Sequence, residues 1–253
     1  MRVFPFAGLV ALALAASPPS VPSLDALRLI EIVSLQSPAY HVQGIDTDGA
    51  RIWTTSVDTA NRRGLLNEYS LKGERIRSVE IQDGDRFHPG GFALQGASLW
   101  IPVAEYRATS TSVIQKRNKH TLTVEFTFRV QDHIGCLAAT SDLLIGCNWD
   151  SRDFYVWNHA GKLLRKVANH SGNAYQDVKV DGSYLVASGL LAERSGAIDW
   201  LNLKSLALIY RMKAGSTDRG ASYTREGMCL FKQRLLLLPE DDPSRVFIYA
   251  MKP

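Results

Sequence analysis

The sequence predicts an all-β protein, a five-bladed β-propeller whose ring is closed by an N-terminal strand that completes the last blade. Three observations predict this fold. A pattern repeats five times at intervals of roughly 40 to 50 residues, each copy reads as short strands separated by turn signals, and the last copy lacks a strand that the chain supplies at its beginning. A β-sandwich or a solenoid would explain neither the extra first strand nor the shortened last repeat.

The repeats align on short polar or glycine-containing segments. Three copies carry a histidine twelve positions before an apolar residue: His41 before Trp53, His88 before Trp100 and His133 before Ile145. Two weaker copies run from Tyr175 to Val186 and from Arg225 to Leu236. Both tryptophans end apolar runs, so we expect their side chains in the core between blades.

Each repeat is expected to contain four strands. In the first they fall at 43–47, 51–56, 65–71 and 75–81, with turn signals at Asp48-Gly49 and Lys72-Gly73. The fifth copy ends after strands at 235–238 and 246–249, whereas residues 27–35 form an apolar strand before the first repeat. Pairing these two ends closes the ring and removes exposed sheet edges, so residues 27–253 form one predicted domain.

The N-terminus predicts an exported protein. Arg2 precedes an apolar run to Ala16 that is too short to span a bilayer, and small residues near its end are typical of a cleavage site. Residues 1–16 are therefore interpreted as a signal peptide, with a buried N-terminal helix as the alternative. Residues 17–26, rich in proline and serine, read as a spacer. We expect a periplasmic or extracellular protein that is not embedded in a membrane.

Composition and charge narrow the function classes. The chain is 45% hydrophobic and 21% charged, with a net charge of +4. Its basic residues are scattered, and the densest group, at 116–120, falls in an expected hairpin turn, so nothing indicates nucleic-acid binding. Cys136 and Cys147 should face one another across a hairpin, either as a disulfide or as two buried thiols.

Candidate site residues follow from the symmetry of a propeller. The first strand of every blade lines the central channel, so equivalent positions form rings at one rim. The expected first ring contains His41, His88 and His133. The next contains Gln43, Gly90, Gly135, Gln176 and Glu226. A third, at the ends of the second strands, contains Asp58, Glu105, Asp150, Leu191 and Asp241, near Asn148, Arg152 and Glu240.

Each group allows a chemical and a structural interpretation. The three histidines can bind one divalent metal ion, or they can act as structural residues or general bases. Glu226 is the candidate catalytic acid or base, because it is the only carboxylate in its expected ring. Each acidic residue of the third ring, taken alone, is typical of a turn. Taken together, these residues can instead line a shared pocket. The candidate ligand-binding residues are Gln43, Glu105, Asn148, Trp149, Arg152, Gln176, Asp177, Glu240 and Asp241.

These observations predict an exported propeller that binds a small polar ligand at the rim of its channel. The enzymatic version is a hydrolase or lyase, assisted by one divalent metal if the histidines bind it. The alternative is a non-catalytic interaction scaffold, whose partner would be another protein. A compact pocket with clustered titratable groups favours the enzyme, and a broad apolar patch on the rim favours the scaffold.

Several segments also carry a resemblance. Phe87-His88-Pro89-Gly90-Gly91, Asp132-His133-Ile134-Gly135, Glu226-Gly227-Met228 and Leu238-Pro239-Glu240-Asp241 resemble a family of exported bacterial proteins of unknown function, over nearly the whole mature chain. More distantly, Gln43-Gly44 is similar to a segment that opens a blade in the five-bladed glutaminyl cyclotransferases, whose Asn-Glu-Leu-Glu signature is absent here. The resemblance implies a propeller and transfers no catalytic residue.

Overall fold

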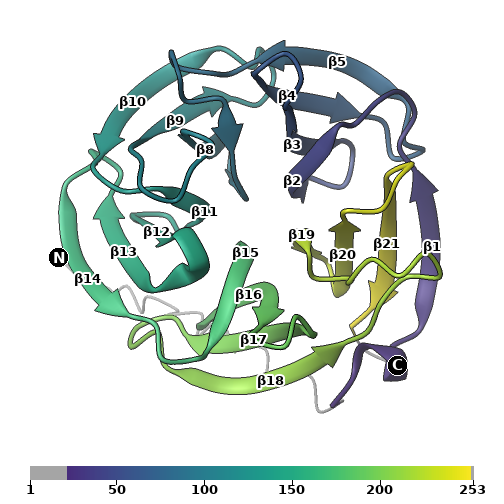
Figure 1. Cartoon of the computed structure of the whole chain (residues 1–253). Helices are drawn as coiled ribbons and strands as arrows, with labels where there is room; N and C mark the ends of the chain where they lie inside the picture. The colour runs from purple at the N-terminus through teal and green to yellow at the C-terminus, as the bar shows by residue number, and fades with distance from the viewer. Residues whose placement is uncertain (1–21, 252–253) are drawn as a thin grey trace, which may run out of the picture.

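The computed structural model describes residues 22–251 and contains five antiparallel sheets arranged around a central axis (Figure 1). The predicted five-bladed propeller is confirmed. The expected signal peptide at 1–16 lies outside the described residues. None of the helices in the described part of the chain is long and apolar enough to span a membrane.

The blades follow one another along the chain, and in each the strand order runs from the axis outward. Blade 1 contains β2 (His41–Thr47), β3 (Ile52–Asp58), β4 (Arg63–Tyr69) and β5 (Arg75–Glu80). Blade 2 contains β6 (His88–Pro89), β7 (Ala93–Gln95), β8 (Ser98–Ala104), β9 (Ser112–Asn118) and β10 (Val124–Val130). Blade 3 contains β11 (Ile134–Ala139), β12 (Leu143–Asn148), β13 (Asp153–Asn158) and β14 (Leu163–Ala168). Blade 4 contains β15 (Asn173–Asp181), β16 (Tyr184–Leu191), β17 (Gly196–Asn202) and β18 (Leu208–Ala214).

Blade 5 joins the two ends of the chain, as predicted. It contains β19 (Glu226–Phe231), β20 (Arg234–Pro239), β21 (Arg245–Ala250) and, as its outermost strand, β1 (Leu29–Ser34). The antiparallel pairing of β1 with β21 runs from Leu29 opposite Tyr249 to Ser34 opposite Arg245. Figure 1 shows the purple N-terminal strand beside the yellow C-terminal one. Unfolding one end of the chain therefore opens the ring.

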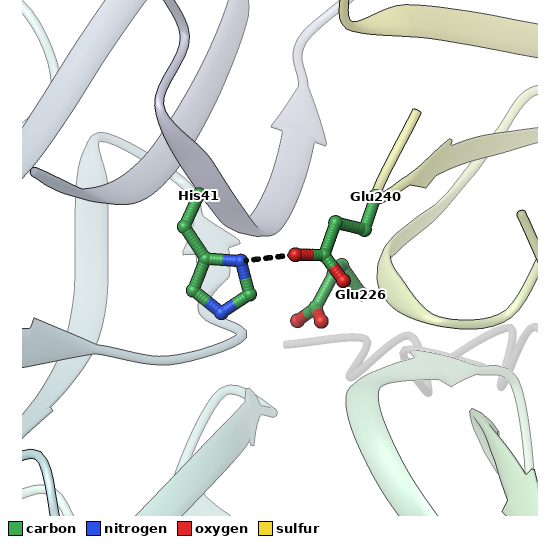
Figure 2. A group of neighbouring side chains, drawn as sticks. All are labelled: His41, Glu226 and Glu240. Carbon is green, nitrogen blue, oxygen red and sulfur yellow. Dashed lines mark ion pairs between the residues drawn. The ribbon is translucent and has the colours of Figure 1, made fainter. Parts of the chain in front are cut away.

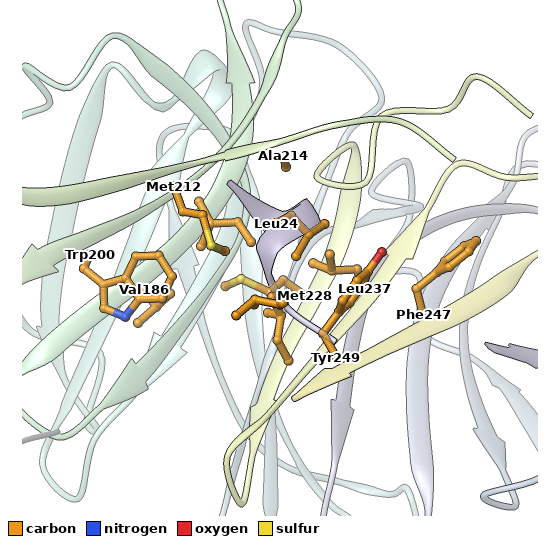
Figure 3. Packing of buried hydrophobic residues seen from close by; sticks show 12 residues of the cluster. Leu24, Val186, Trp200, Met212, Ala214, Met228, Leu237, Phe247 and Tyr249 are labelled. Carbon is orange, nitrogen blue, oxygen red and sulfur yellow. The ribbon is translucent and has the colours of Figure 1, made fainter. Parts of the chain in front are cut away.

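The N-terminal segment packs into the core just before β1. Leu24, in the 3-10 helix η1 (Leu24–Ala26), is fully buried although it lies inside the expected spacer at 17–26. Its side chain joins a cluster between blades 4 and 5 that includes Met212, Met228 and Leu237 (Figure 3). Lys213 N also donates a hydrogen bond to Pro22 O. The folded domain thus begins a few residues before position 27.

The core lies between neighbouring blades, because each sheet presents one apolar face to the next sheet. Trp53 and Trp100 are 2% and 1% exposed and belong to different inter-blade clusters, as their positions in the sequence predicted. Cys136 and Cys147 are opposite residues of β11 and β12, and both are buried free thiols.

Close packing at the axis requires glycine in blade 2. A Cβ atom on Gly90 would overlap the carbonyl oxygen of Gly135, and one on Gly91 would lie 2.6 Å from Asp177 Oδ1. Gly91 instead exchanges backbone hydrogen bonds with β11, because its N–H donates to Gly135 O and its C=O accepts from Leu137 N, both at 3.0 Å. The inner strand of blade 2 is consequently split into β6 and β7.

Below the rim, buried charges connect the inner strands. Lys179 Nζ lies 2.6 Å from both Asp177 Oδ1 and the carbonyl oxygen of Phe92. Asp177 Oδ2 accepts hydrogen bonds from the backbone N–H groups of Ile45 in blade 1 and Met228 in blade 5. One ion pair on β15 therefore contacts the inner segments of three other blades. Such a pair is costly to break, because each charge would remain buried without its partner.

Candidate functional site

A polar pocket lies at the axis, on the face where the inner strands begin. Its volume is about 240 Å³. All five blades contribute side chains or backbone to its wall. The lining residues are His41, Gln43, His88, Tyr106, His133, Gly135, Asn148, Trp149, Asp150, Tyr175, Gln176 and Glu226.

β-Bulges place part of this lining. In β2, β11 and β15 the pairing register shifts by one residue, and the residues left between paired neighbours are Gln43, Gly135 and Gln176. A bulge residue has no partner on the adjacent strand, and the local bend re-aims its side chain. Gln43 and Gln176 thereby reach the pocket, as expected from their shared ring, and Gly135 leaves room at the corresponding place in blade 3.

Two buried imidazoles form one side of the pocket. The ring centroids of His88 and His133 are 5.3 Å apart, and those of His88 and Tyr106 are 4.6 Å apart. His133 Nδ1 contacts the carbonyl oxygen of Arg107 at 2.9 Å and Ser110 Oγ at 3.1 Å, whereas His88 Nδ1 is buried without a hydrogen-bond partner. Burial, followed by the neighbouring His133, lowers the pKa of His88 to about 3. Burial also lowers the pKa of His133, so both rings are neutral at physiological pH.

Glu226 faces these rings from blade 5. It opens β19 as His41 opens β2 and His88 opens β6, and the pairing of β19 with β20 shows no bulge. Met228 N and Ile45 N both donate to Asp177 Oδ2, so Glu226 lies two residues before Met228 as Gln43 lies two residues before Ile45. It lines the pocket together with Gln43 and Gln176. The residue has φ of 106° and is 5% exposed. Burial, and next the charge of Glu240, raise the pKa of Glu226 to about 8.

His41, Glu226 and Glu240 meet where blades 1 and 5 adjoin (Figure 2). His41 Nδ1 lies 3.0 Å from Glu240 Oε1, and Arg225 Nη2 lies 2.7 Å from Glu240 Oε2. Arg225 Nε is 3.9 Å from Glu226 Oε1. Burial is the largest influence on His41 and lowers its pKa, against the opposing effect of Glu240. We call these three side chains the His41–Glu226–Glu240 corner.

The pocket adjoins a wider hollow of about 710 Å³. His41, Trp149, Gln176 and Glu226 line both. Arg152, predicted from its place beside the third ring, lines the hollow together with Arg194 and Arg225. A ligand in the pocket therefore has an entrance edged with guanidinium groups, next to the indole of Trp149.

The structure separates the remaining predicted residues from this pocket. Glu105 accepts hydrogen bonds from Arg107 and Thr111 in another hollow of the rim. Asp241 is buried and pairs with Arg219 and Arg245. Asp58 likewise pairs with Arg63. These carboxylates fix their own loops, as acidic residues in turns commonly do, and Asp177 belongs to the buried ion pair below the rim.

The three histidines do not converge on one point. Within residues 22–251, one group of three metal-binding side chains has donor atoms that all lie within 4.8 Å of one another. That group is the His41–Glu226–Glu240 corner. Of the predicted metal ligands, His41 is in this group, while His88 and His133 lie together across the pocket.

Sequence reasoning missed two pocket residues, Tyr106 and Tyr175, and also Arg225, which lines the adjoining hollow. Tyr106 follows Glu105 in the loop between β8 and β9, the same connection that holds Trp149 in blade 3, so the ring logic could have found it. Tyr175 lies in the inner strand β15 and hydrogen-bonds Asp199 at 2.8 Å through its hydroxyl, which no repeat pattern indicates.

The arrangement suits proton transfer and hydrogen bonding to an uncharged group. At neutral pH the pocket contains neutral imidazole rings and a protonated carboxyl group, next to two glutamine amides. A buried acid with a pKa near the working pH can both donate and accept a proton.

Several solved structures have a similar fold. A glutaminyl cyclase of Myxococcus xanthus matches with a TM-score of 0.68 and 13% identity, covering 88% of this chain and 94% of the other. A tail fiber of Staphylococcus aureus phage P68 gives 0.58 and 17%, covering 91% of this chain and 54% of the other. The Pan2 WD40 domain of Neurospora crassa gives 0.51 and 10%, with coverages of 86% and 70%. At these identities the likeness concerns the fold alone.

No curated protein matches the sequence at a significant level. A family model does match, over residues 29–181, which include blades 1 to 3 and the inner strand of blade 4. This range contains the three pocket histidines and both bulge glutamines. The chain therefore belongs to a family of unknown function (DUF6454).

Proposed function

We propose that the axial pocket binds a small polar ligand and that Glu226 exchanges a hydrogen bond or a proton with it. The observation that carries this proposal is the state of the Glu226 side chain, which is 6% exposed and lines the pocket. No described residue donates a hydrogen bond to its carboxyl group. The carboxyl oxygens open onto the pocket and have no donor from the described residues, so they are available to a partner that arrives from outside.

The other pocket groups support an uncharged or weakly charged ligand with several hydrogen-bonding atoms. Gln43 and Gln176 supply amides, and His88 supplies a neutral ring. Trp149 and Tyr106 supply aromatic surface at the edge. Small-molecule sites generally combine such apolar walls with a few convergent polar groups. A hydrolase or lyase that uses Glu226 as general acid and base is the reaction class that fits this chemistry.

The interaction-scaffold alternative finds less support in the described residues. The large exposed apolar side chains lie mainly on the outermost strands of the blades, for example Leu163 and Leu164 of β14 and Ile209 of β18, away from the rim pocket. We also propose export from the cytoplasm, on the basis of the signal peptide expected at 1–16.

Thermal-shift screening tests the proposal. A panel of amides, amino-acid derivatives, dipeptides and short polyols is added to the tag-free protein in buffer with EDTA. A ligand at about 100 times its Kd stabilises by about 2.7 kcal/mol, which corresponds to an increase in Tm of about 5 to 10 °C for a domain of this size. Glu226→Gln, which keeps the shape of the side chain, should abolish most of the shift.

Glu105→Gln is the matched control, because Glu105 lies on the same rim in a different hollow. Compounds that shift Tm are then incubated at high concentration with the parent and both variants, and products are detected by mass spectrometry. A panel without any compound that distinguishes parent from Glu226→Gln would count against the pocket. Binding without turnover would leave a binding module.

A further inference from the structure

The His41–Glu226–Glu240 corner has the donors of a metal site. His41 begins β2, Glu226 begins β19 and Glu240 directly follows β20, so the three side chains come from the two blades that close the ring. Figure 2 shows the imidazole and both carboxyl groups directed toward one another. One imidazole nitrogen and two carboxylate oxygens are borderline-hard donors, a set that suits Zn²⁺ and related first-row divalent ions.

The spacing of the donors also fits one ion. Ligand atoms bound to Zn²⁺ at about 2.0 to 2.2 Å in tetrahedral geometry lie about 3.3 Å from each other. His41 Nδ1 and Glu240 Oε1 are 3.0 Å apart, and the whole group lies within 4.8 Å. This nitrogen is buried, and its contact with Glu240 is an ion-pair contact that lacks the direction of a hydrogen bond.

Glu226 provides a second, independent observation. Its side chain is 6% exposed, and no described residue donates a hydrogen bond to it. Other buried acids of the described chain differ: Asp58 is bonded to Arg63 and Asn61, and Asp241 to Arg219 and Arg245. The nearest cationic atom to Glu226, Arg225 Nε, is 3.9 Å away. A buried carboxyl group with no donor requires a counter-charge or a proton.

Arg225 occupies the position of an orienting residue outside the corner. Its Nη2 forms an ion pair with Glu240 Oε2 at 2.7 Å, while Glu240 Oε1 contacts His41. Ligating carboxylates are commonly held by such a partner on their second oxygen. The guanidinium therefore fixes Glu240 and does not fill the place between the three donors.

We infer that the His41–Glu226–Glu240 corner binds one divalent transition-metal ion of the zinc class. Three protein ligands leave at least one coordination position open, and that position faces the pocket through Glu226, which lines it. A water molecule or a polar atom of the ligand can take it. This inference goes beyond the proposed function, because cation binding is measured without any organic ligand and ligand binding is measured with EDTA.

Isothermal titration with ZnSO₄ alone tests the inference, using tag-free protein that has been stripped with chelator. The parent should bind one equivalent. His41→Gln, Glu226→Gln and Glu240→Gln should each weaken binding at least 30-fold, because each removes one of three ligands. His133→Gln is the matched control on the opposite wall, and Glu105→Gln is the control for loss of a rim carboxylate. Both should bind as the parent does.

Two further measurements keep the result interpretable. The Tm of each variant in EDTA shows whether it is folded, and a variant that does not fold is replaced by the corresponding Ala. Co²⁺ in place of Zn²⁺ reports the ligand set through its visible absorption, which His41→Gln should change and His133→Gln should not. An anomalous difference map from a Zn²⁺-soaked crystal should place the ion between the three side chains.

The absence of stoichiometric binding to the parent would overturn the inference. So would binding that survives in all three corner variants, or binding that is lost with His133→Gln, since the latter would return the ion to the three-histidine set expected from the sequence. A panel of ligands that fails in EDTA, with normal Zn²⁺ binding, would instead remove the proposed function and leave the metal site.

Discussion

Replacing Lys179 with Met should destabilise the propeller by about 3 to 5 kcal/mol. Lys179 Nζ is 2.6 Å from Asp177 Oδ1 and from Phe92 O, and 4.0 Å from Asp46 Oδ2. At 2.6 Å and an effective dielectric constant of about 20, the attraction to Asp177 is about 6 kcal/mol. Met fills a similar volume without the charge, so the ammonium no longer has to be desolvated and part of the loss is offset. Breaking one side of a buried pair typically costs about 3 to 5 kcal/mol.

The cost arises because Asp177 stays behind. It is 0% exposed and would retain its backbone donors, Ile45 N, Val178 N and Met228 N, as its described partners. Combining Lys179→Met with Asp177→Asn removes the stranded charge, so the double variant should be more stable than the sum of the two single effects predicts.

Urea unfolding followed by tryptophan fluorescence measures these differences, since the midpoint and the slope give the free energy of unfolding. Lys232 directly follows β19, the inner strand of blade 5, and its ammonium lies over the Phe231 ring. Lys232→Met is therefore a lysine control that should change stability by less than about 1 kcal/mol. A loss below about 1 kcal/mol for Lys179→Met, or additive single effects, would refute the view that this pair holds the inner strands together.

Further predictions concern single sites. Glu226 has a folded-state pKa of about 8 against an ordinary value of 4.5, so the unfolded chain ionises first and stability in EDTA should fall by about 3 to 5 kcal/mol as pH rises from 4.5 to 8. Glu226→Gln should lose this decline in pH-dependent urea titrations; an unchanged slope would contradict the raised pKa. Leu24→Ala should cost about 3 kcal/mol, because the side chain is fully buried between blades 4 and 5, and a change in Tm below 2 °C would place the N-terminal segment outside the cooperative fold. Gly90→Ala should be at least as damaging, because its Cβ would overlap Gly135 O, whereas Gly96→Ala, with open space around it, tests the cost of backbone strain alone. Export should appear as a mature chain shortened near residue 16 by N-terminal sequencing, and retention of Met1 in the cell envelope fraction would argue against a cleaved signal.

Much of the fold was predictable because a propeller repeats itself. The recurrence of His41, His88 and His133 at a constant distance from an apolar residue marked the inner strands of three blades, and the unpaired segment at 27–35 indicated ring closure. Strand limits differed from expectation by a few residues, since turn residues at strand ends can pair or not without changing the pattern.

The site was predictable in its location and less so in its grouping. Ring logic placed the histidines, Gln43, Asn148, Trp149, Gln176 and Glu226 at one pocket, and all of them line it. It also added Glu105, Asp177 and Asp241, whose arginine, lysine or backbone partners lie in loops and strands that the repeat pattern does not relate to them. Acidic residues at matched positions share a rim without sharing a pocket.

The sequence by itself determined the architecture, because strand period, turn residues and repeat length are local properties that recur in every blade. Only the tertiary structure decided which side chains meet. Glu226 and Glu240 reach His41 because β1 closes blade 5 and brings blades 5 and 1 together, across nearly the whole length of the chain. The bulges at Gln43 and Gln176 depend on how each inner strand pairs, and β19 of blade 5 pairs with β20 without a bulge. Such contacts depend on strand register and on which strand ends come together in space, which no local pattern encodes.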